Sequence, residues 1–178
     1  MQKTLVLIVI FFLGTTLSSN AQKFAGIQKS PTDISYAKAN RSDKPDIKVV
    51  YSRPQKKGRA IFGELVPFGK VWRTGADEAT EIKLSKDMTI GGTLVKAGVY
   101  SLFTIPNEKE WTIILNSDLD SWGAYAYDEK KDVARINVPV KQSEELEAFS
   151  IAFEKTDNGY TMFLGWDTTL VKVPFYSK

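Results

Sequence analysis

The sequence predicts an all-β fold: an antiparallel β-sandwich of about eight strands with Greek-key, immunoglobulin-like connections and one long crossover loop. Short runs of β-branched and aromatic residues recur along the chain, separated by Gly, Pro and Asn at intervals of roughly 8–12 residues. Only one segment, 142–147, has the composition of a helical turn. The motif Lys96-Ala97-Gly98-Val99-Tyr100 is typical of a sandwich strand that begins with a corner tyrosine, whose hydroxyl bonds back to nearby backbone.

The expected strands follow in chain order, beginning with 47–52. In 80–85, apolar Ile82 and Leu84 alternate with charged neighbours, which indicates a strand with one buried face. Residues 87–91 predict a short strand that runs into a tight turn at two consecutive glycines. Further strands are expected at 99–105, 111–116, 134–140, 149–153, 160–166 and 171–175.

Residues 1–21 have the pattern of a secretory signal peptide. A lysine precedes an almost entirely apolar run at 5–13, and small residues lead to a cleavage site expected after Ala21. The apolar run is too short to span about 30 Å of hydrocarbon, so no stable membrane insertion is expected after cleavage. Residues 22–46 predict a polar lead-in and 47–176 a single domain. We therefore expect a periplasmic or secreted protein of a Gram-negative envelope.

The composition excludes many classes of chemistry. The chain has no histidine and no cysteine, which excludes Ser-His-Asp and Cys-His catalysis, histidine metal sites and thiol redox chemistry. No nucleotide-binding glycine motif occurs, and we expect no cofactor and no metal. The formal charge of +3 is small and charges of both signs are interleaved, so no nucleic-acid partner is expected. The oligomeric state stays open.

The stretch from Arg59 to Thr80 is the most informative part of the sequence. It combines turn residues, further charges and a Trp-Arg pair, which predicts a structured loop. The planar guanidinium of Arg73 suits a carboxylate, phosphate or sulfate, and Trp72 beside it offers a stacking face. The candidate ligand-binding residues of this region are Trp72, Arg73, Arg53, Arg59 and Glu78.

A second explanation of the same loop is structural. Arg73 could pair with Asp77 or Glu78 and pin a long connection between strands. Ion-pair networks of this kind imitate binding sites, so this explanation is favoured over a ligand pocket.

The stretch 117–129 is a second candidate region. Trp122, Tyr125 and Tyr127 stand near acidic residues and resemble platforms that stack on sugar rings, so Trp122 and Tyr125 join the candidate ligand-binding residues. If the segment is extended, Tyr125 and Tyr127 share one face. Packing in the core or at a sheet edge is the favoured explanation, because aromatic side chains are usually buried.

Two aspartates in this stretch, Asp118 and Asp120, could place oxygens on a calcium ion. Asx turns at the end of a strand explain both aspartates as well. No metal site is therefore expected.

Motifs along most of the chain resemble the family catalogued as domain of unknown function 2911. The resemblance extends roughly from Pro31 to Pro174 and includes the run Leu65–Thr80, of which the block Trp72–Thr80 makes it specific. It implies an exported bacterial domain with no assigned activity, so no catalytic residues follow from it. Asp77 departs from the family's pattern, which usually has Asn there, and would give Arg73 another local acid. Further matching motifs are Ser52-Arg53-Pro54, Lys57–Arg59, Ile61–Gly63, Ala97–Pro106, Trp111-Thr112, Trp122-Gly123 and Tyr127-Asp128.

The expected function is an exported, non-catalytic binding module for a polar or anionic small ligand, a glycan or a cell-envelope partner. One alternative is a hydrolase that uses a pair of carboxylates on glycans or peptidoglycan, because carboxylates are the catalytic groups left by the composition. Another is a structural scaffold whose arginine loop only closes the fold.

Overall fold

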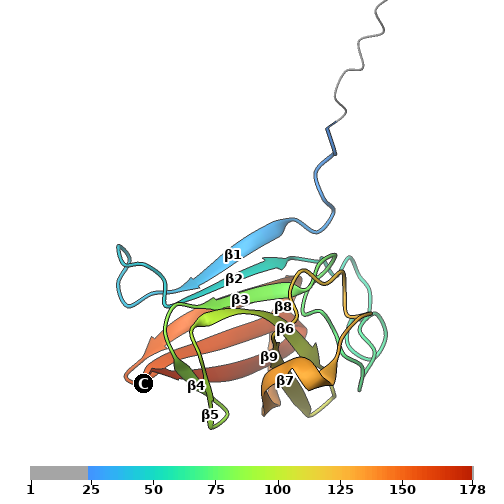
Figure 1. Cartoon of the computed structure of the whole chain (residues 1–178). Helices are drawn as coiled ribbons and strands as arrows, with labels where there is room; N and C mark the ends of the chain where they lie inside the picture. The colour runs from blue at the N-terminus through green and yellow to red at the C-terminus, as the bar shows by residue number, and fades with distance from the viewer. Residues whose placement is uncertain (1–23, 178) are drawn as a thin grey trace, which may run out of the picture.

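The computed structural model describes residues 24–177, and these form an all-β domain (Figure 1). Nine strands make one open antiparallel sheet in the order β1-β2-β3-β6-β7-β8-β9-β4-β5. The predicted all-β, antiparallel class is confirmed. No helix among the described residues is long and apolar enough to cross a membrane. The strands are β1 (Thr32–Ala37), β2 (Ile47–Ser52), β3 (Thr80–Leu84), β4 (Met88–Ile90), β5 (Thr93–Val95), β6 (Gly98–Ile105), β7 (Glu110–Asn116), β8 (Asp132–Thr156) and β9 (Gly159–Ser177), with a 3-10 turn, η1 (Glu129–Lys131), before β8.

The long strand β8 belongs to both halves of the sheet. Its first part pairs with β7 up to Pro139, and its second part pairs with β9 from Val140 onward. The sheet curls, so that β1, β2 and β3 lie over β8 and β9 (Figure 1). One continuous sheet therefore supplies both layers, and the predicted sandwich with Greek-key connections is not confirmed. The long loop, 53–79, is present and joins β2 to β3, two strands that pair directly.

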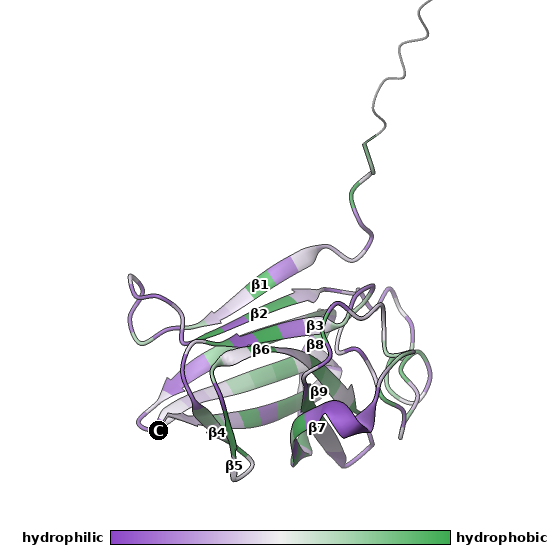
Figure 2. Ribbon diagram, in the orientation of Figure 1, coloured by the Kyte–Doolittle hydropathy of each residue, from purple (hydrophilic) through white to green (hydrophobic). Residues whose placement is uncertain are grey.

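The core lies between the layers of the curled sheet. Hydrophobic and hydrophilic residues alternate along β3, as the colours in Figure 2 show. At its centre is an aromatic cluster in which Trp72 stacks on Trp166 with ring centroids 6.0 Å apart. Edge-to-face contacts add Phe62, Trp111 and Phe149. Such aromatic pairs contribute about 0.5–1.5 kcal/mol each beyond the area they bury.

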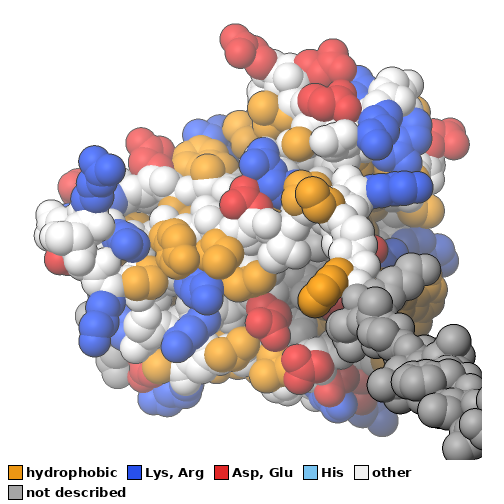
Figure 3. Space-filling view, turned by 90° about the horizontal axis from the view of Figure 1, so that it is seen from above, with side chains coloured by type: hydrophobic (Ala, Val, Ile, Leu, Met, Phe, Trp, Pro, Cys, Tyr) orange, Lys and Arg blue, Asp and Glu red, His pale blue; other side chains and the backbone are white. Residues whose placement is uncertain are grey.

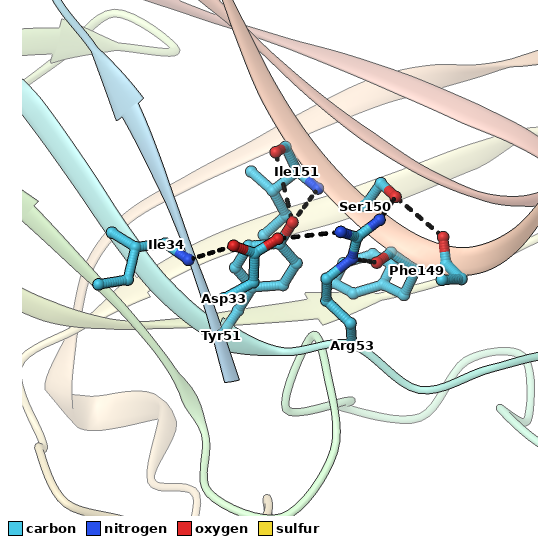
Figure 4. Close-up of polar contacts among 8 residues, drawn as sticks. Asp33, Ile34, Tyr51, Arg53, Phe149, Ser150 and Ile151 are labelled. Carbon is cyan, nitrogen blue, oxygen red and sulfur yellow. Dashed lines mark hydrogen bonds and ion pairs between the residues drawn. The ribbon is translucent and has the colours of Figure 1, made fainter. Parts of the chain in front are cut away.

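A polar clamp joins β1 and β2 to β8 across the layers (Figure 4). Arg53, just after β2, donates to the Phe149 carbonyl oxygen at 3.1 Å and to the Ser150 hydroxyl at 2.7 Å, and it pairs with Asp33 of β1 at 3.0 Å. The buried Tyr51 hydroxyl accepts a hydrogen bond from the Ile151 backbone N–H at 3.0 Å. These bonds hold the two layers in register.

Two strands are longer than the sequence predicts. The runs 134–140 and 149–153 belong to one strand, β8, and 160–166 and 171–175 both belong to β9. The helical turn expected at 142–147 is wrong, because this segment is part of β8 and the register with β9 shifts on either side of Leu146. Its helix-favouring glutamates are overridden by pairing with β9, since tertiary context outweighs intrinsic propensity.

One strand lies before residue 47, where the domain was expected to begin. The segment 22–46, expected as a polar lead-in, contains β1, which pairs along its whole length with β2. The predicted signal peptide, 1–21, lies outside the described residues. The corner tyrosine is confirmed, because Tyr100 donates from its hydroxyl to the Lys96 carbonyl oxygen at 3.0 Å.

Candidate functional site

The loop 53–79 is fixed at both ends of its course. Near its start, Lys56 Nζ bonds to Glu145 at 2.6 Å and to Asp167 at 2.7 Å, which ties the loop to β8 and to β9. Near its end, the backbone of Trp72 exchanges two hydrogen bonds with Thr104 of β6, at 2.7 and 2.9 Å. The loop is therefore ordered against the sheet, as the sequence predicts.

Trp72 forms an isolated antiparallel bridge with Thr104, and the backbone departs from extended geometry at Thr74, whose φ is +56°. Trp72 and Thr74 are buried, and Arg73 between them is partly exposed. The Thr74 hydroxyl donates to the Thr104 hydroxyl at 3.1 Å, and the Thr80 hydroxyl donates to the Thr74 carbonyl oxygen at 2.7 Å. These buried hydroxyl contacts hold the backbone next to Arg73 in place.

Trp72 is mainly a core residue. Its side chain is only 8% exposed, and its indole N–H donates to the Gly75 carbonyl oxygen at 3.0 Å. It still contributes an edge to the hollows beside Arg73. The structure thus places Trp72 in the floor of the candidate site, with little surface for stacking.

Arg73 has no carboxylate partner among residues 24–177, so the expected ion pair with Asp77 or Glu78 is not formed. Its Nη1 donates to the backbone carbonyl oxygen of Asp77 at 2.9 Å. The same oxygen accepts the Gly123 backbone N–H at 3.2 Å. The guanidinium is held in place without neutralisation of its charge.

Asp77 has a backbone reason for its position. Its φ is +60°, in the left-handed region where Asp and Asn are several times more frequent than most other non-glycine residues. An Asn at this position would meet the same backbone requirement. The acid at Asp77 therefore does not indicate an ion pair with Arg73.

The stretch 117–128 forms a loop that packs against the end of the first loop. Ala79 N–H donates to the Ser121 carbonyl oxygen at 2.9 Å, and an isolated bridge pairs Glu78 with Trp122. Trp122 is 61% exposed and Tyr125 is 84% exposed. Two large aromatic side chains therefore stand in solvent on an ordered loop, and neither packs in the core.

Tyr127 behaves differently from Tyr125. The segment turns here and is not extended, so the two tyrosines do not share a face. Tyr127 packs edge-to-face on Phe103 and donates its hydroxyl to Asp132 at 2.7 Å. Burial and this hydrogen bond raise the pKa of Tyr127 above its usual range. Tyr127 anchors the loop, whereas Tyr125 is displayed by it.

Two adjoining hollows surround Arg73. One, of about 320 Å³, is lined by Arg73 and Trp72 together with Arg59 and Asp77. The other, of about 220 Å³, is lined by Arg73, Trp72 and Tyr125. Ligand pockets usually measure about 300–1,000 Å³, so these hollows fit a small group such as one sugar ring and its acidic substituent.

The other candidate residues are spread over a wider area. Arg53 is engaged in the clamp to β8 and lines neither hollow. Arg59 is exposed, donates to the Lys56 and Gln55 carbonyl oxygens, and lines the larger hollow. Glu78 lines a separate hollow of about 240 Å³ with Glu81 and Asp120.

The weak calcium candidate is not supported by the geometry. Asp118 pairs with Lys131 Nζ at 2.7 Å, and its N–H bonds to Asn116. Asp120 takes a left-handed conformation with a φ of +56° and lines the hollow of Glu78. Within the described part of the chain, no group of three or more acidic residues is arranged to hold a metal ion.

Sequence reasoning missed the role of Gly123. With a φ of +70°, it lies so close to Arg73 and Tyr125 that an added Cβ would stand 3.2 Å from Nη1 and 3.0 Å from the tyrosine ring. A glycine in a turn segment is the general sequence signal for a left-handed φ or a close approach to the backbone.

A comparison with protein-family models tests the family resemblance that the sequence motifs indicate. The model described as "Protein of unknown function (DUF2911)" matches residues 30–175, nearly the whole described domain. The chain belongs to the DUF2911 family. We found no significant match to this DUF2911 domain among curated proteins or among solved structures. The function of this DUF2911 protein therefore has to be argued from its own geometry.

Proposed function

We propose that this protein is an exported, non-catalytic module that binds an acidic glycan of the cell envelope in the hollows around Arg73. The observation that carries the proposal is the state of Arg73 itself. Its guanidinium is fixed by the Asp77 carbonyl oxygen, lacks an ion pair among residues 24–177, and lines both hollows. A guanidinium offers five donors, so one backbone bond leaves most of them for a ligand.

The neighbouring aromatic residues favour a sugar as the body of that ligand. Tyr125 lines the smaller hollow beside Arg73, and Trp122 precedes the glycine that touches the guanidinium. Exposed Trp and Tyr rings present flat apolar faces with a polar edge, which suits the face of a pyranose ring. Arg73 would bind the carboxylate of an acidic sugar in a two-point contact, which is stronger than a neutral hydrogen bond.

The predicted export of the protein is consistent with such a ligand. The pattern of residues 1–21 predicts export, and acidic sugars occur in envelope polymers. The chain has no histidine and no cysteine. The loops 53–79 and 117–128 therefore support selective binding through arginine and aromatic residues best.

Binding of tri-galacturonic acid, compared with its neutral methyl ester, tests the proposal. Isothermal titration calorimetry on the mature protein should show binding of the acid, and R73A should weaken it by about 1.5–3 kcal/mol, the usual contribution of a hydrogen bond to a charged group. R41A removes another arginine, whose side chain forms no hydrogen bond or ion pair among the described residues, and should bind like wild type. Equal affinity for the acid and its ester would contradict the proposal.

A carboxylate-based hydrolase is the second candidate. It is favoured by the hollow that Glu78, Glu81 and Asp120 line together. Release of reducing ends from a glycan or from peptidoglycan, lost in E78Q or in D120N, would support it. Binding without turnover, with both variants binding as wild type does, would support the non-catalytic module. The scaffold explanation predicts neither binding nor turnover.

A further inference from the structure

A row of four residues crosses the outer face of the sheet near the β1–β2 loop. The strand registers place Tyr36 opposite Lys48, Lys48 opposite Lys83, and Lys83 opposite Val99. Two lysines therefore face each other directly across β2 and β3, between an aromatic and an apolar residue. Like charges in directly opposed positions of an antiparallel pair are destabilising.

A hollow of about 530 Å³ lies at this row and exceeds the hollows around Arg73 in size. Lys48 and Lys83 line it, and Lys44 from the β1–β2 loop adds a third positive charge. Pro45 and Val99 supply apolar walls. Figure 3, which looks down on this face, shows Lys and Arg side chains gathered around hydrophobic ones at the end that carries the β1–β2 loop.

No partner among residues 24–177 neutralises the three lysines. None of the three ammonium groups forms an ion pair or a hydrogen bond there. Asp46 pairs with Lys86 at 2.7 Å and Asp87 pairs with Lys96 at 2.9 Å. Asp43, beside Lys44 in the β1–β2 loop, accepts a hydrogen bond from the Asn40 amide at 2.8 Å.

We infer that this hollow binds a phosphate monoester, with Lys44, Lys48 and Lys83 around the phosphate and the apolar walls against its organic substituent. Lysine ammonium groups are compact charges with rotatable donors, and a phosphate monoester carries about −1.5 to −2 charges at pH 7. Such a ligand would relieve the repulsion between Lys48 and Lys83, so its binding would gain from a strain already present in the free protein.

The site is separate from the one around Arg73. Lys48 lies near the start of β2, whereas the loop 53–79 follows the end of that strand, so the two sites lie at opposite ends of the domain (Figure 1). The inference therefore does not depend on the acidic-glycan proposal. The phosphate could come from a soluble compound or from a lipid headgroup, because both present the same group.

Phenyl phosphate and phosphatidic acid vesicles test the two sources on the mature protein. Binding of phenyl phosphate is measured by calorimetry, and co-sedimentation compares phosphatidylcholine vesicles with and without phosphatidic acid. The double variant K48Q/K83Q should weaken binding about tenfold, as expected for the loss of two charge contacts. K44Q/K83Q, which leaves β2 unchanged, should have a similar effect.

The matched control is K109Q/K141Q, which removes the same charge from two other exposed lysines, one in the turn before β7 and one in β8. It should bind as wild type does, and so should R73A, because Arg73 belongs to the other site. Binding of phenyl phosphate alone identifies a soluble ligand, and binding of the vesicles identifies a lipid headgroup. Failure of the wild type to bind either probe, or unchanged binding by K48Q/K83Q, overturns the inference.

Discussion

Arg73 Nη1 lies 2.9 Å from the backbone carbonyl oxygen of Asp77, and the carboxylate of Asp77 forms no ion pair with it. An acid beside an arginine usually both positions the guanidinium and neutralises its charge, whereas Asp77 only positions it. The carbonyl oxygen fixes the guanidinium but leaves its charge available. Because Gly123 donates to the same oxygen, the bond also connects the two loops that form the candidate site.

Substitution of Asp77 distinguishes a backbone role from an ion pair. D77N and D77G should keep the free energy of unfolding within about 0.5 kcal/mol of wild type, because both residues accept a left-handed φ. D77A should lower it by about 1 kcal/mol, since alanine pays the cost of that conformation. Urea denaturation measures all three. A D77N variant less stable than D77A would show that the carboxylate matters.

The clamp between the layers should depend on the Tyr51 hydroxyl. Y51F leaves the buried Ile151 N–H without its partner, which costs about 1–3 kcal/mol. Y36F, which removes the hydroxyl of a 45% exposed tyrosine, is the matched control and should change stability by less than about 0.5 kcal/mol. Denaturation with unchanged midpoints for both variants would mean that the clamp does not stabilise the curl of the sheet.

Tyr160 should make stability depend on pH in the alkaline range. Burial and a hydrogen bond to Asp46 raise its pKa from 10.0 to about 12. The folded state holds this proton more tightly than the unfolded chain, so the contribution is complete below pH 10 and is lost as the pH rises through about 12.

The difference in melting temperature between wild type and Y160F should therefore shrink between pH 10 and 12. Y176F removes the hydroxyl of a 48% exposed tyrosine and controls for the loss of a phenol. A wild-type advantage over Y160F that is constant across this range would contradict the assignment.

Trp122 should be the quenchable tryptophan of the domain. It is 61% exposed, whereas Trp72, Trp111 and Trp166 are 8%, 1% and 1% exposed. Acrylamide should quench one accessible fraction of the fluorescence, and W122F should abolish that fraction. Tri-galacturonic acid should protect it in the wild type if the ring contacts a sugar. Unprotected fluorescence at saturating ligand would remove Trp122 from the site.

Much of the fold could be predicted because local pattern and tertiary context agree. The alternation of Ile82 and Leu84 predicts β3, and the motif ending at Tyr100 predicts its hydrogen bond to Lys96. The predicted helical turn at 142–147 is wrong, because these helix-favouring residues belong to β8, where the register with β9 shifts around Leu146. A single continuous sheet was not predictable, because joining strands across Leu146 depends on distant pairing.

Only some of the predicted site residues line the two hollows around Arg73. Trp72, Arg59 and Tyr125 do, whereas Arg53, Glu78 and Trp122 do not. Trp72 and Arg73 are adjacent in sequence, yet the first is buried in the core and the second is partly exposed. The charge on Asp77 suggested an ion pair, whereas its φ explains the residue. The opposed pair Lys48 and Lys83 could not be recognised before the register of β2 and β3 was known.

The central claim is that Arg73, whose guanidinium is fixed by the protein but not neutralised by it, binds an anionic ligand. The most direct measurement is a calorimetric comparison of wild type, R73A and R41A with tri-galacturonic acid. The account predicts that wild type and R41A bind alike and that R73A loses about 1.5–3 kcal/mol of binding free energy. It also predicts that R73A keeps the wild-type melting temperature within a few degrees. Equal binding by a folded R73A would contradict the account.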